Sequence, residues 1–357
     1  MKRNRYSRRD VLKGSTALAA ATMFASPIRA AAPPAEPITP ALIEAAKKEG
    51  KVVWYTSLDL PVAERVAKAF EAKYAGIATR VERTGAERVF QRIGQEYASR
   101  IFAADVVQSS DGAHFIVWKR DGILLPYVPE DVAKFWPAEH KDPDGQFASF
   151  RVWLAVIGYN TNMVKAEEAP KSYADLLDPK WSGKLVKAHP GYSGTIMTAT
   201  FQISRDLGWD YLEKLSKQKV MQVQSSADPP KKLALGERAV MVDGNEYNMF
   251  QEKEKSPPSP VEIVYPAEGT PLIIGPNGVL KNAPNPNAAK LFQSFCFTPE
   301  AQQLIIDVGG LRSVHPQTKE KPGRKPFKEI KTLKDDAAGV EKQGEEIKAR
   351  YSKLFGV

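Results

Sequence analysis

Cysteine is nearly absent from this 357-residue sequence. The one cysteine, Cys296, has no partner for an internal disulfide. A single thiol also excludes iron–sulfur clusters and cysteine-based zinc sites, which need several thiolates. Because Cys296 lies in the apolar helical pattern LFQSFCFTPEA, we expect a buried small side chain and no reactive thiol.

Histidine and the common catalytic motifs are also scarce. The four histidines are scattered, without the His-x-x-x-His spacing of zinc hydrolases. No glycine-rich dinucleotide fingerprint and no P-loop lysine occurs, so we expect no cofactor. The segment GYSGT, residues 191–195, lacks the spacing of a nucleophile turn, and no histidine is placed to serve Ser193. We therefore expect no enzyme, with an exported hydrolase that has its active site in a cleft as an alternative.

Positive charge is concentrated at the N-terminus. The chain carries 51 Lys plus Arg against 42 Asp plus Glu, a net charge of +9. The first thirty residues hold seven of the basic residues and one acidic residue, which leaves 44 against 41 in the remainder. This excess does not indicate a nucleic-acid partner, because most of it belongs to the N-terminal segment.

Residues 1–30 have the form of a secretory signal peptide. Basic positions precede an apolar stretch from Gly14 to Ala25, which is shorter than the ~20 residues of a membrane-spanning helix. Small residues then suit cleavage after Ala30 or Ala32. The pair Arg8-Arg9 predicts the twin-arginine route. We expect a periplasmic protein whose export partner is the twin-arginine translocase.

The remainder alternates between predicted strands and helices. The first strand is KVVWYTS, the helix after it is LPVAERVAKAFEAKY, and the order repeats to the helix that Asp111 caps. This order predicts an α/β fold with mainly parallel sheets flanked by helices. About 325 residues remain beyond the predicted signal peptide, which is more than a single hydrophobic core usually supports, so we expect two lobes. The predicted boundaries are 31–150 plus 270–316 for the first lobe, 151–269 for the second, and 317–357 for a C-terminal linker and a helix on the surface.

Small polar residues follow the predicted strands of both lobes. Because the carboxyl ends of parallel strands share one edge, and helix N-termini point to it, we expect these residues to line a cleft between the lobes that suits an anion. The candidate ligand-binding residues are Thr56, Ser57, Ser109, Ser110, Asp111, Ser193, Gly194, Thr195, Ser226, Asn245, Glu246 and Tyr247.

Several longer motifs resemble one known family. YADLLDPKWSGKL, GERAVMVDGNEY and PNPNAAKLFQSFCFTPEAQ are similar to the type II extracellular (periplasmic) solute-binding proteins of ABC importers, family 1, in the branch of ferric-iron, thiamine and phosphonate binders. The resemblance implies the two-lobed type II fold, with crossover strands near residues 150–160 and near 270. It also implies a small solute held between the lobes and an ABC permease in the inner membrane as partner. We expect a monomer.

The resemblance also leaves a ferric-iron carrier open as an alternative. Iron binders of this branch place two adjacent tyrosines where this chain has Glu246-Tyr247. Under that alternative the metal ligands would be Asp59, Glu246 and Tyr247. Because one tyrosine of the pair is replaced, we favour a small, anionic organic solute. Glu246 or Asp243 would then neutralise a basic group on that solute.

Overall fold

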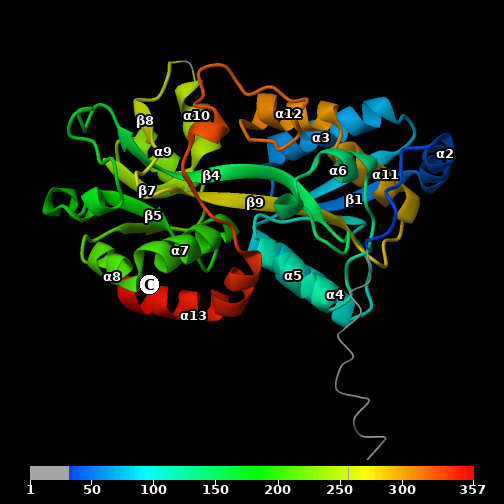
Figure 1. Ribbon diagram of the computed structural model, residues 1–357, viewed down its shortest axis with the longest axis horizontal. Helices are drawn as coiled ribbons and strands as arrows, with labels where there is room; N and C mark the ends of the chain where they lie inside the picture. The colour runs from blue at the N-terminus through cyan, green and yellow to red at the C-terminus, as the bar shows by residue number, and fades with distance from the viewer. Residues whose placement is uncertain (1–31, 256) are drawn as a thin grey trace, which may run out of the picture. The chain divides into compact units, whose positions relative to one another are not determined.

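The computed structural model describes residues 32–255 and 257–357, so the predicted signal peptide lies outside the described range (Figure 1). Ten strands form one mixed sheet. Eight of them lie in the order β2-β1-β3-β9-β4-β7-β5-β6, while β8 pairs with β4 and β10 with β9. None of the helices in the described residues is both long and apolar enough to cross a membrane.

The strands run in chain order from the first lobe through the second and back. They are β1 (Lys51–Thr56), β2 (Ala78–Arg83), β3 (Val106–Gln108), β4 (Ala148–Asn160), β5 (Leu185–Ala188), β6 (Met221–Val223), β7 (Val240–Asn245), β8 (Val261–Val264), β9 (Thr270–Val279) and β10 (Thr332–Leu333). The helices are α2 (Pro40–Glu49), α3 (Leu60–Lys73), α4 (Ala86–Ala98), α5 (Gly112–Arg120), α6 (Glu130–Phe135), α7 (Gly194–Leu207), α8 (Trp209–Ser216), α9 (Asp228–Ala234), α10 (Glu246–Lys253), α11 (Pro286–Cys296), α12 (Pro299–Gly309) and α13 (Ala337–Phe355).

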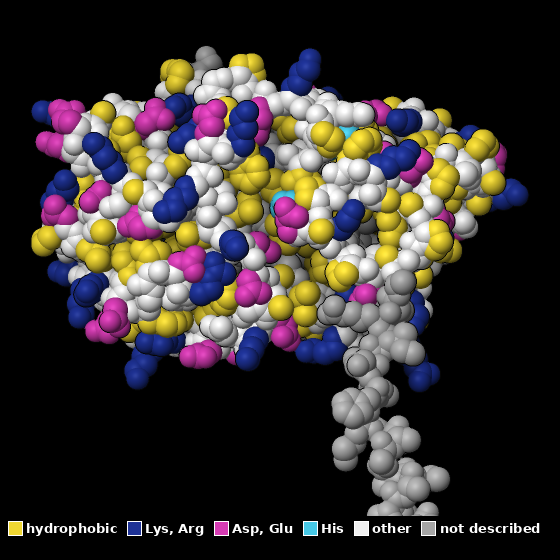
Figure 2. All heavy atoms as spheres, viewed as in Figure 1, with side chains coloured by type: hydrophobic (Ala, Val, Ile, Leu, Met, Phe, Trp, Pro, Cys, Tyr) yellow, Lys and Arg dark blue, Asp and Glu magenta, His cyan; other side chains and the backbone are white. Residues whose placement is uncertain are grey.

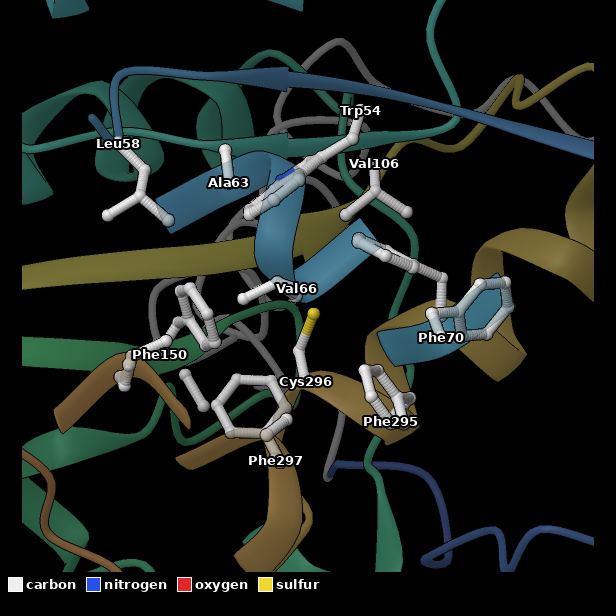
Figure 3. Packing of buried hydrophobic residues seen from close by; sticks show 14 of the residues in the cluster. Trp54, Leu58, Ala63, Val66, Phe70, Val106, Phe150, Phe295, Cys296 and Phe297 are labelled. Atoms are coloured by element: carbon white, nitrogen blue, oxygen red, sulfur yellow. The ribbon is translucent and has the colours of Figure 1, made fainter. Parts of the chain in front are cut away.

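The first lobe is built on β2, β1, β3 and β9. β1 pairs in parallel with β2 and β3, and β3 pairs antiparallel with the end of β9. Helices α3 and α11 bury an aromatic core against this sheet, in which Trp54, Phe70 and Phe292 meet edge to face (Figure 3 labels the first two). Cys296 is fully buried in this core, as the apolar pattern predicted.

The second lobe is built on β7, β5, β6 and the second half of β4. β5 pairs in parallel with both β6 and β7, and β4 pairs antiparallel with β7 and β8. A separate hydrophobic cluster that includes Tyr173, Leu212 and Val240 fills this lobe. In the described residues each lobe therefore has a main hydrophobic cluster of its own, with smaller clusters beside them, in agreement with the two predicted lobes.

Two long strands carry the chain between the lobes. The first half of β4 pairs with β9, for example Trp153 with Ile273, and its second half pairs in the second lobe, for example Tyr159 with Val240. Arg312 lies against the first half of β4, because it exchanges backbone hydrogen bonds with Val152 at 3.0 and 3.1 Å. Side chains on β4 therefore lie at the base of any cleft between the lobes.

Local sequence signals explain the helix starts that flank this region. Asp111 and Ser193 lie at the N-caps of α5 and α7, and their side chains accept hydrogen bonds from Ala113 N and Ile196 N. Thr298 caps α12 in the same way. The short helices α2, α6 and α8 had no assignment from the sequence. They begin at Pro40, Glu130 and Trp209.

The C-terminal region differs from a simple surface linker. Within residues 317–334, Arg324 and Ile330 are buried, and β10 adds to β9. The closing helix α13 lies at Ala337–Phe355, within the predicted C-terminal region 317–357, and packs against α5, α7 and α8 (Figure 1). The domain boundaries themselves stay a prediction.

Charge of both signs is distributed over the face shown in Figure 2, where basic and acidic side chains are interspersed. This mixture agrees with the nearly balanced charge of the chain beyond residue 30.

Candidate functional site

A cavity of about 360 Å³ lies between the two lobes. Its first-lobe wall consists of Ser57, Asp59, Arg83, Gly85, Ala86, Glu87, Arg88, Gln91 and Ser110, its second-lobe wall of Gly191, Tyr192, Ser193, Gly194, Thr195, Gln224, Ser225, Ser226, Ala227, Asn245 and Tyr247, and Arg151 comes from the crossover strand β4. Nearly every side chain in this set is polar or small. The cavity therefore suits a hydrophilic molecule.

Three helices of at least eight residues begin at the cavity wall. Gly85 precedes α4, Ser193 precedes α7 and Asn245 precedes α10, and the first turn of each helix contributes to the lining. Neither Gly85 nor Asn245 caps its helix with a side-chain hydrogen bond. Helix N-termini present free N–H groups and a partial positive charge, so this arrangement favours an anion.

Arg151 supplies a full positive charge at the base of the cavity. The side chain is 2% exposed, and its Nε and Nη1 atoms have no hydrogen-bond partner among the described residues. Burial lowers the pKa of Arg151 from its ordinary value, but a guanidinium stays charged in proteins. Its guanidinium lies 4.3 Å from the centre of the Trp153 ring. A buried charge with unmade hydrogen bonds is costly, so the site is preorganised for an anionic partner.

A glycine on the neighbouring strand makes room for this arginine. A Cβ atom at Gly275 would lie 2.9 Å from Arg151 Cγ and 2.9 Å from Trp153 Cζ3. Such distances are too short for carbon atoms, so a larger residue here would displace the guanidinium. The pairing of β4 with β9 therefore positions Arg151.

Asn245 and Tyr247 lie at the start of α10 beside this charge. Asn245 Nδ2 donates to the Tyr247 hydroxyl at 2.9 Å and to Asn248 Oδ1 at 2.8 Å, while Asn245 Oδ1 is buried without a partner among the described residues. Burial raises the pKa of Tyr247, which the neighbouring Arg151 only partly offsets, so the phenol is neutral at ordinary pH. The unpaired amide oxygen would accept a hydrogen bond from a hydroxyl or amino group of a ligand.

Most of the predicted site residues do lie together at this cavity. Ser57, Ser110, Ser193, Gly194, Thr195, Ser226, Asn245 and Tyr247 all line it, as does Asp59. They come from both lobes and from five separate segments. Their role in binding stays a prediction, since the structure holds no ligand.

Thr56, Ser109 and Asp111 do not line the cavity and are corrections to the predicted set. The Thr56 hydroxyl donates to Gln108 Oε1 at 2.8 Å, and the Ser109 hydroxyl lies 3.0 Å from His114 Nδ1. Asp111 caps α5. Successive side chains alternate across a strand, so only one residue of each pair at a strand end faces the cavity.

Glu246 is a further correction. Its carboxylate receives two hydrogen bonds of 2.8 Å from Arg312 and one of 2.9 Å from Arg324. Tyr265 also donates to it, at 2.5 Å. Burial alone would raise the pKa of Glu246, but the two arginines outweigh burial and hold the pKa below its ordinary value. The carboxylate is therefore occupied within the protein, away from the cavity wall.

Asp243 is likewise unavailable to neutralise a basic group on a ligand. It forms a fully buried ion pair with Lys187 at 2.6 Å, beneath the sheet of the second lobe. Neither residue lines the cavity.

Reasoning from the sequence missed the cationic side chains of the site. Arg151 and the more exposed Arg83 and Arg88 all line the cavity. The sequence did contain an indication of Arg151, because this residue interrupts the apolar strand SFRVWLAVIGYN. An arginine is rarely buried in such a strand unless it is paired with another group. Arg83 Nη2 lies 3.9 Å from Asp59 Oδ1. The Asp59 carboxylate therefore has a basic neighbour within the protein.

The geometry bears on the iron alternative. Of its three proposed ligands, Glu246 is held by arginines, and Asp59 and Tyr247 lie beside Arg83 and Arg151. Over residues 32–255 and 257–357, no three His, Cys, Asp or Glu side chains are grouped to hold a metal ion. The positive charges in the cavity oppose a bare cation.

Two families match the sequence. The family described as bacterial extracellular solute-binding protein matches residues 103–336, and the family of twin-arginine translocation pathway signal sequences matches residues 5–25. The second match confirms the predicted export signal and the periplasmic location. The cleavage site was not tested by it.

Three known proteins are similar to this chain. A Salmonella typhimurium periplasmic protein named for 2-aminoethylphosphonate binding is 30% identical over 250 residues, which are 66% of this chain and 69% of that protein. The periplasmic binding protein AfuA of Actinobacillus pleuropneumoniae, solved with fructose-6-phosphate bound, has a TM-score of 0.77 at 24% identity, covering 87% of this chain and 99% of AfuA. Iron-bound HitA of Pseudomonas aeruginosa has a TM-score of 0.75 at 22% identity, covering 85% and 99%. The predicted type II periplasmic-binding fold is confirmed.

Proposed function

We propose that this chain, which belongs to the bacterial extracellular solute-binding proteins, captures a small phosphate- or phosphonate-bearing organic anion in its interlobe cavity and delivers it to an ABC permease. The observation that carries the proposal is Arg151, a buried cation at the base of the cavity with two unpaired donor nitrogens. The anionic group of the solute would accept hydrogen bonds from this guanidinium and from the N-termini of α4, α7 and α10.

The rest of the cavity supports a polar remainder on the solute. Asn245 Oδ1 needs a hydrogen-bond donor, and serine, threonine and glutamine side chains line the walls. A ligand with hydroxyl or amino groups beside its anion would satisfy these groups. Two similar proteins point the same way, since one is named for an aminophosphonate and another was solved with a sugar phosphate.

Closure of the lobes would follow from contacts that one solute makes with both walls. In this structure the lobes already touch, because a Cβ atom at Gly194 would lie 2.7 Å from Asp111 Cβ. A ligand that contacts Ser110 and Arg151 on one side and Thr195 on the other favours the closed state by its extra contacts.

A matched panel of compounds tests the proposed ligand class. Fructose 6-phosphate, 2-aminoethylphosphonate and inorganic phosphate are compared with fructose and ethanolamine, which lack the anion. We expect at least one phosphorus-bearing compound to stabilise the protein by about 2.7 kcal/mol at a hundredfold excess over its Kd, and the counterparts without the anion to leave the melting temperature unchanged. Binding of fructose or ethanolamine with equal affinity would refute the anion assignment.

The iron alternative has its own test. A ferric-ion carrier with a phenolate ligand becomes coloured when ferric citrate is added to the metal-free protein. Because the Glu246 carboxylate is bound by arginines and Arg83 and Arg151 line the cavity, we expect no visible absorption band. A stoichiometric band that disappears in Tyr247→Phe would replace the anion proposal by iron transport.

We propose that binding occurs without turnover. No histidine lines the cavity to activate Ser193, and the Ser193 hydroxyl accepts a hydrogen bond from Ile196 N. Phosphorus NMR of fructose 6-phosphate incubated with the protein should show the ester intact. Release of inorganic phosphate that Ser193→Ala abolishes would instead establish the hydrolase.

A further inference from the structure

The C-terminal helix α13 contacts both lobes at once (Figure 1). Its residues Val340 and Ile347 share a buried cluster with Ala113 of α5 in the first lobe and with Met197 and Phe201 of α7 in the second. This cluster is separate from the cores of the two lobes. Relative movement of the lobes must therefore separate α13 from one of them.

The second half of α13 is fastened to the second lobe. The Tyr351 hydroxyl donates to Gln222 Oε1 at 2.8 Å, and Ser352 Oγ lies 3.2 Å from His189 Nε2. The Arg350 guanidinium lies 4.4 Å from the centre of the Trp209 ring. Tyr351 is fully buried. These contacts fix the helix to the second lobe over its last two turns.

Contacts of a different kind, spread from Ala337 to Lys348, join α13 to the first lobe. Arg120 Nη1 donates to Glu341 Oε1 at 2.9 Å, and Lys348 Nζ lies 3.8 Å from Glu87 Oε2. Both pairs are partly exposed, with Arg120 at 62% and Glu341 at 29%. A Cβ atom at Gly112 would lie 3.0 Å from Ala337 Cβ, so the backbones are close here. Exposed ion pairs are weak and break readily, unlike the buried contacts with the second lobe.

These contacts adjoin the entrance of the candidate binding site. A groove of about 240 Å³ is lined by residues of α13, α4, α5 and α7, and it shares Glu87 and residues 191–194 with the main cavity. Glu87 therefore belongs both to the cavity wall and to the α13 contact. Opening of the cavity at this side requires the Arg120–Glu341 and Lys348–Glu87 pairs to part.

We propose that α13 is an interlobe latch: it moves with the second lobe, and its ion pairs with Arg120 and Glu87 hold the closed form. The latch does not depend on the identity of the solute. Its strength sets the open-to-closed ratio of the ligand-free protein, and hence the fraction of molecules that admit a solute.

Electron–electron distance measurements on ligand-free protein test the latch. Spin labels at Gln95→Cys in α4 and Lys214→Cys in α8 report the distance between the lobes, since both positions are exposed and the native Cys296 is fully buried. We expect Arg120→Ala, Glu341→Ala and Lys348→Ala each to raise the population at longer distance by about two- to fivefold, as for one exposed ion pair. The double variant Arg120→Ala/Glu341→Ala should add nothing beyond either single change.

Two controls make the result specific. Glu130→Ala removes the ion pair between Glu130 and Lys134 of α6, which is 2.7 Å long and also exposed. Because this pair lies within one lobe, Glu130→Ala should leave the interlobe distances unchanged. The reversed pair Arg120→Glu/Glu341→Arg should restore the wild-type distribution. Unchanged distances in all three latch variants, or an equal shift in Glu130→Ala, would overturn the proposal.

Discussion

Two buried arginines, Arg312 and Arg151, lie close together but differ in their hydrogen-bond partners. Arg312 is fully buried and satisfied, with hydrogen bonds to Glu246, Glu320 and the carbonyl of Lys325. Arg151 is equally buried, yet two of its donor nitrogens lack a partner among the described residues. Arg151 is the residue before Val152 in β4, and Arg312 pairs with Val152 through the backbone. Of these two arginines, only Arg151 lines the cavity.

We propose that this difference separates a structural charge, Arg312, from a ligand-binding charge, Arg151. A buried carboxylate held by two arginines ties together the segments that carry these residues, here α10 and residues 312–324. A buried cation left unpaired lowers the stability of the empty protein and raises its affinity for an anion. Burial alone does not distinguish the two roles, while the set of partners does.

The largest predicted effect removes the partner of the satisfied arginine. Glu246→Gln leaves Arg312 and Arg324 with an uncharged partner in a buried site, so we expect a loss of about 3–5 kcal/mol in the free energy of unfolding. Urea denaturation measures it. Glu320→Gln, which removes a partner that is 34% exposed, should cost less than about 1 kcal/mol. Equal losses in the two variants would contradict the structural role of Glu246.

The second prediction concerns the unsatisfied arginine. Arg151→Gln should weaken binding of the anion found by the compound panel by about 30-fold or more, since truncating one partner of a buried charge pair costs at least about 2 kcal/mol. The free energy of unfolding of the empty protein should stay unchanged or rise, because an unpaired buried charge is removed. Calorimetric titration and urea denaturation give the two values. A strongly destabilised variant that still binds would reverse the assigned roles of the two arginines.

The third prediction uses pH to compare two buried carboxylates. Burial raises the pKa of Asp243 to about 6 despite its Lys187 partner, whereas arginines lower the pKa of Glu246. A carboxyl whose folded pKa exceeds its unfolded value of about 3.9 binds more protons when folded, so its contribution to stability is lost as pH rises from about 4 through about 6.

The stability lost through Asp243 over this pH range is on the order of 2–3 kcal/mol, at about 1.4 kcal/mol for each pKa unit. Urea denaturation between pH 4 and 7 should show a smaller fall for Lys187→Met/Asp243→Asn than for the wild type. Parallel stability curves for the two proteins would mean that Asp243 titrates normally.

The smallest predicted effect lies at the seam between the lobes. A methyl group at Gly194 would meet Asp111 Cβ at 2.7 Å, so Gly194→Ala should hinder closure and weaken ligand binding by about tenfold. Gly94→Ala is the control, because nothing lies within 4 Å of a Cβ atom there and the position is inside α4. That change should instead stabilise the protein by about 0.5–1 kcal/mol without altering affinity. Equal binding by the two variants would argue that the lobes do not close at this contact.

Much of the fold followed from local patterns. The apolar run before Thr56, the N-caps Asp111 and Thr298 and the alternation of strand and helix depend on neighbouring residues, so they are readable along the chain. Short helices such as α8 were missed, because too few turns carry a periodic signal. The cavity residues were predicted only in part for a related reason. The end of a strand shows which loop lies at the edge of the sheet, but it does not show which side chain of that loop points into the cavity.

The sequence by itself determined the export signal, the two-lobed α/β architecture and the segments that border the cleft, because each depends on residue types at short spacing. Only the tertiary structure decided that Glu246 is bound by Arg312 and Arg324, that two Arg151 nitrogens at the cavity lack a partner among the described residues, and that α13 joins the lobes. These contacts join residues 66 and 78 positions apart in the first case, and no local pattern records such a separation. Charge partners over that distance are chosen by the packing of the sheet and its crossover strands.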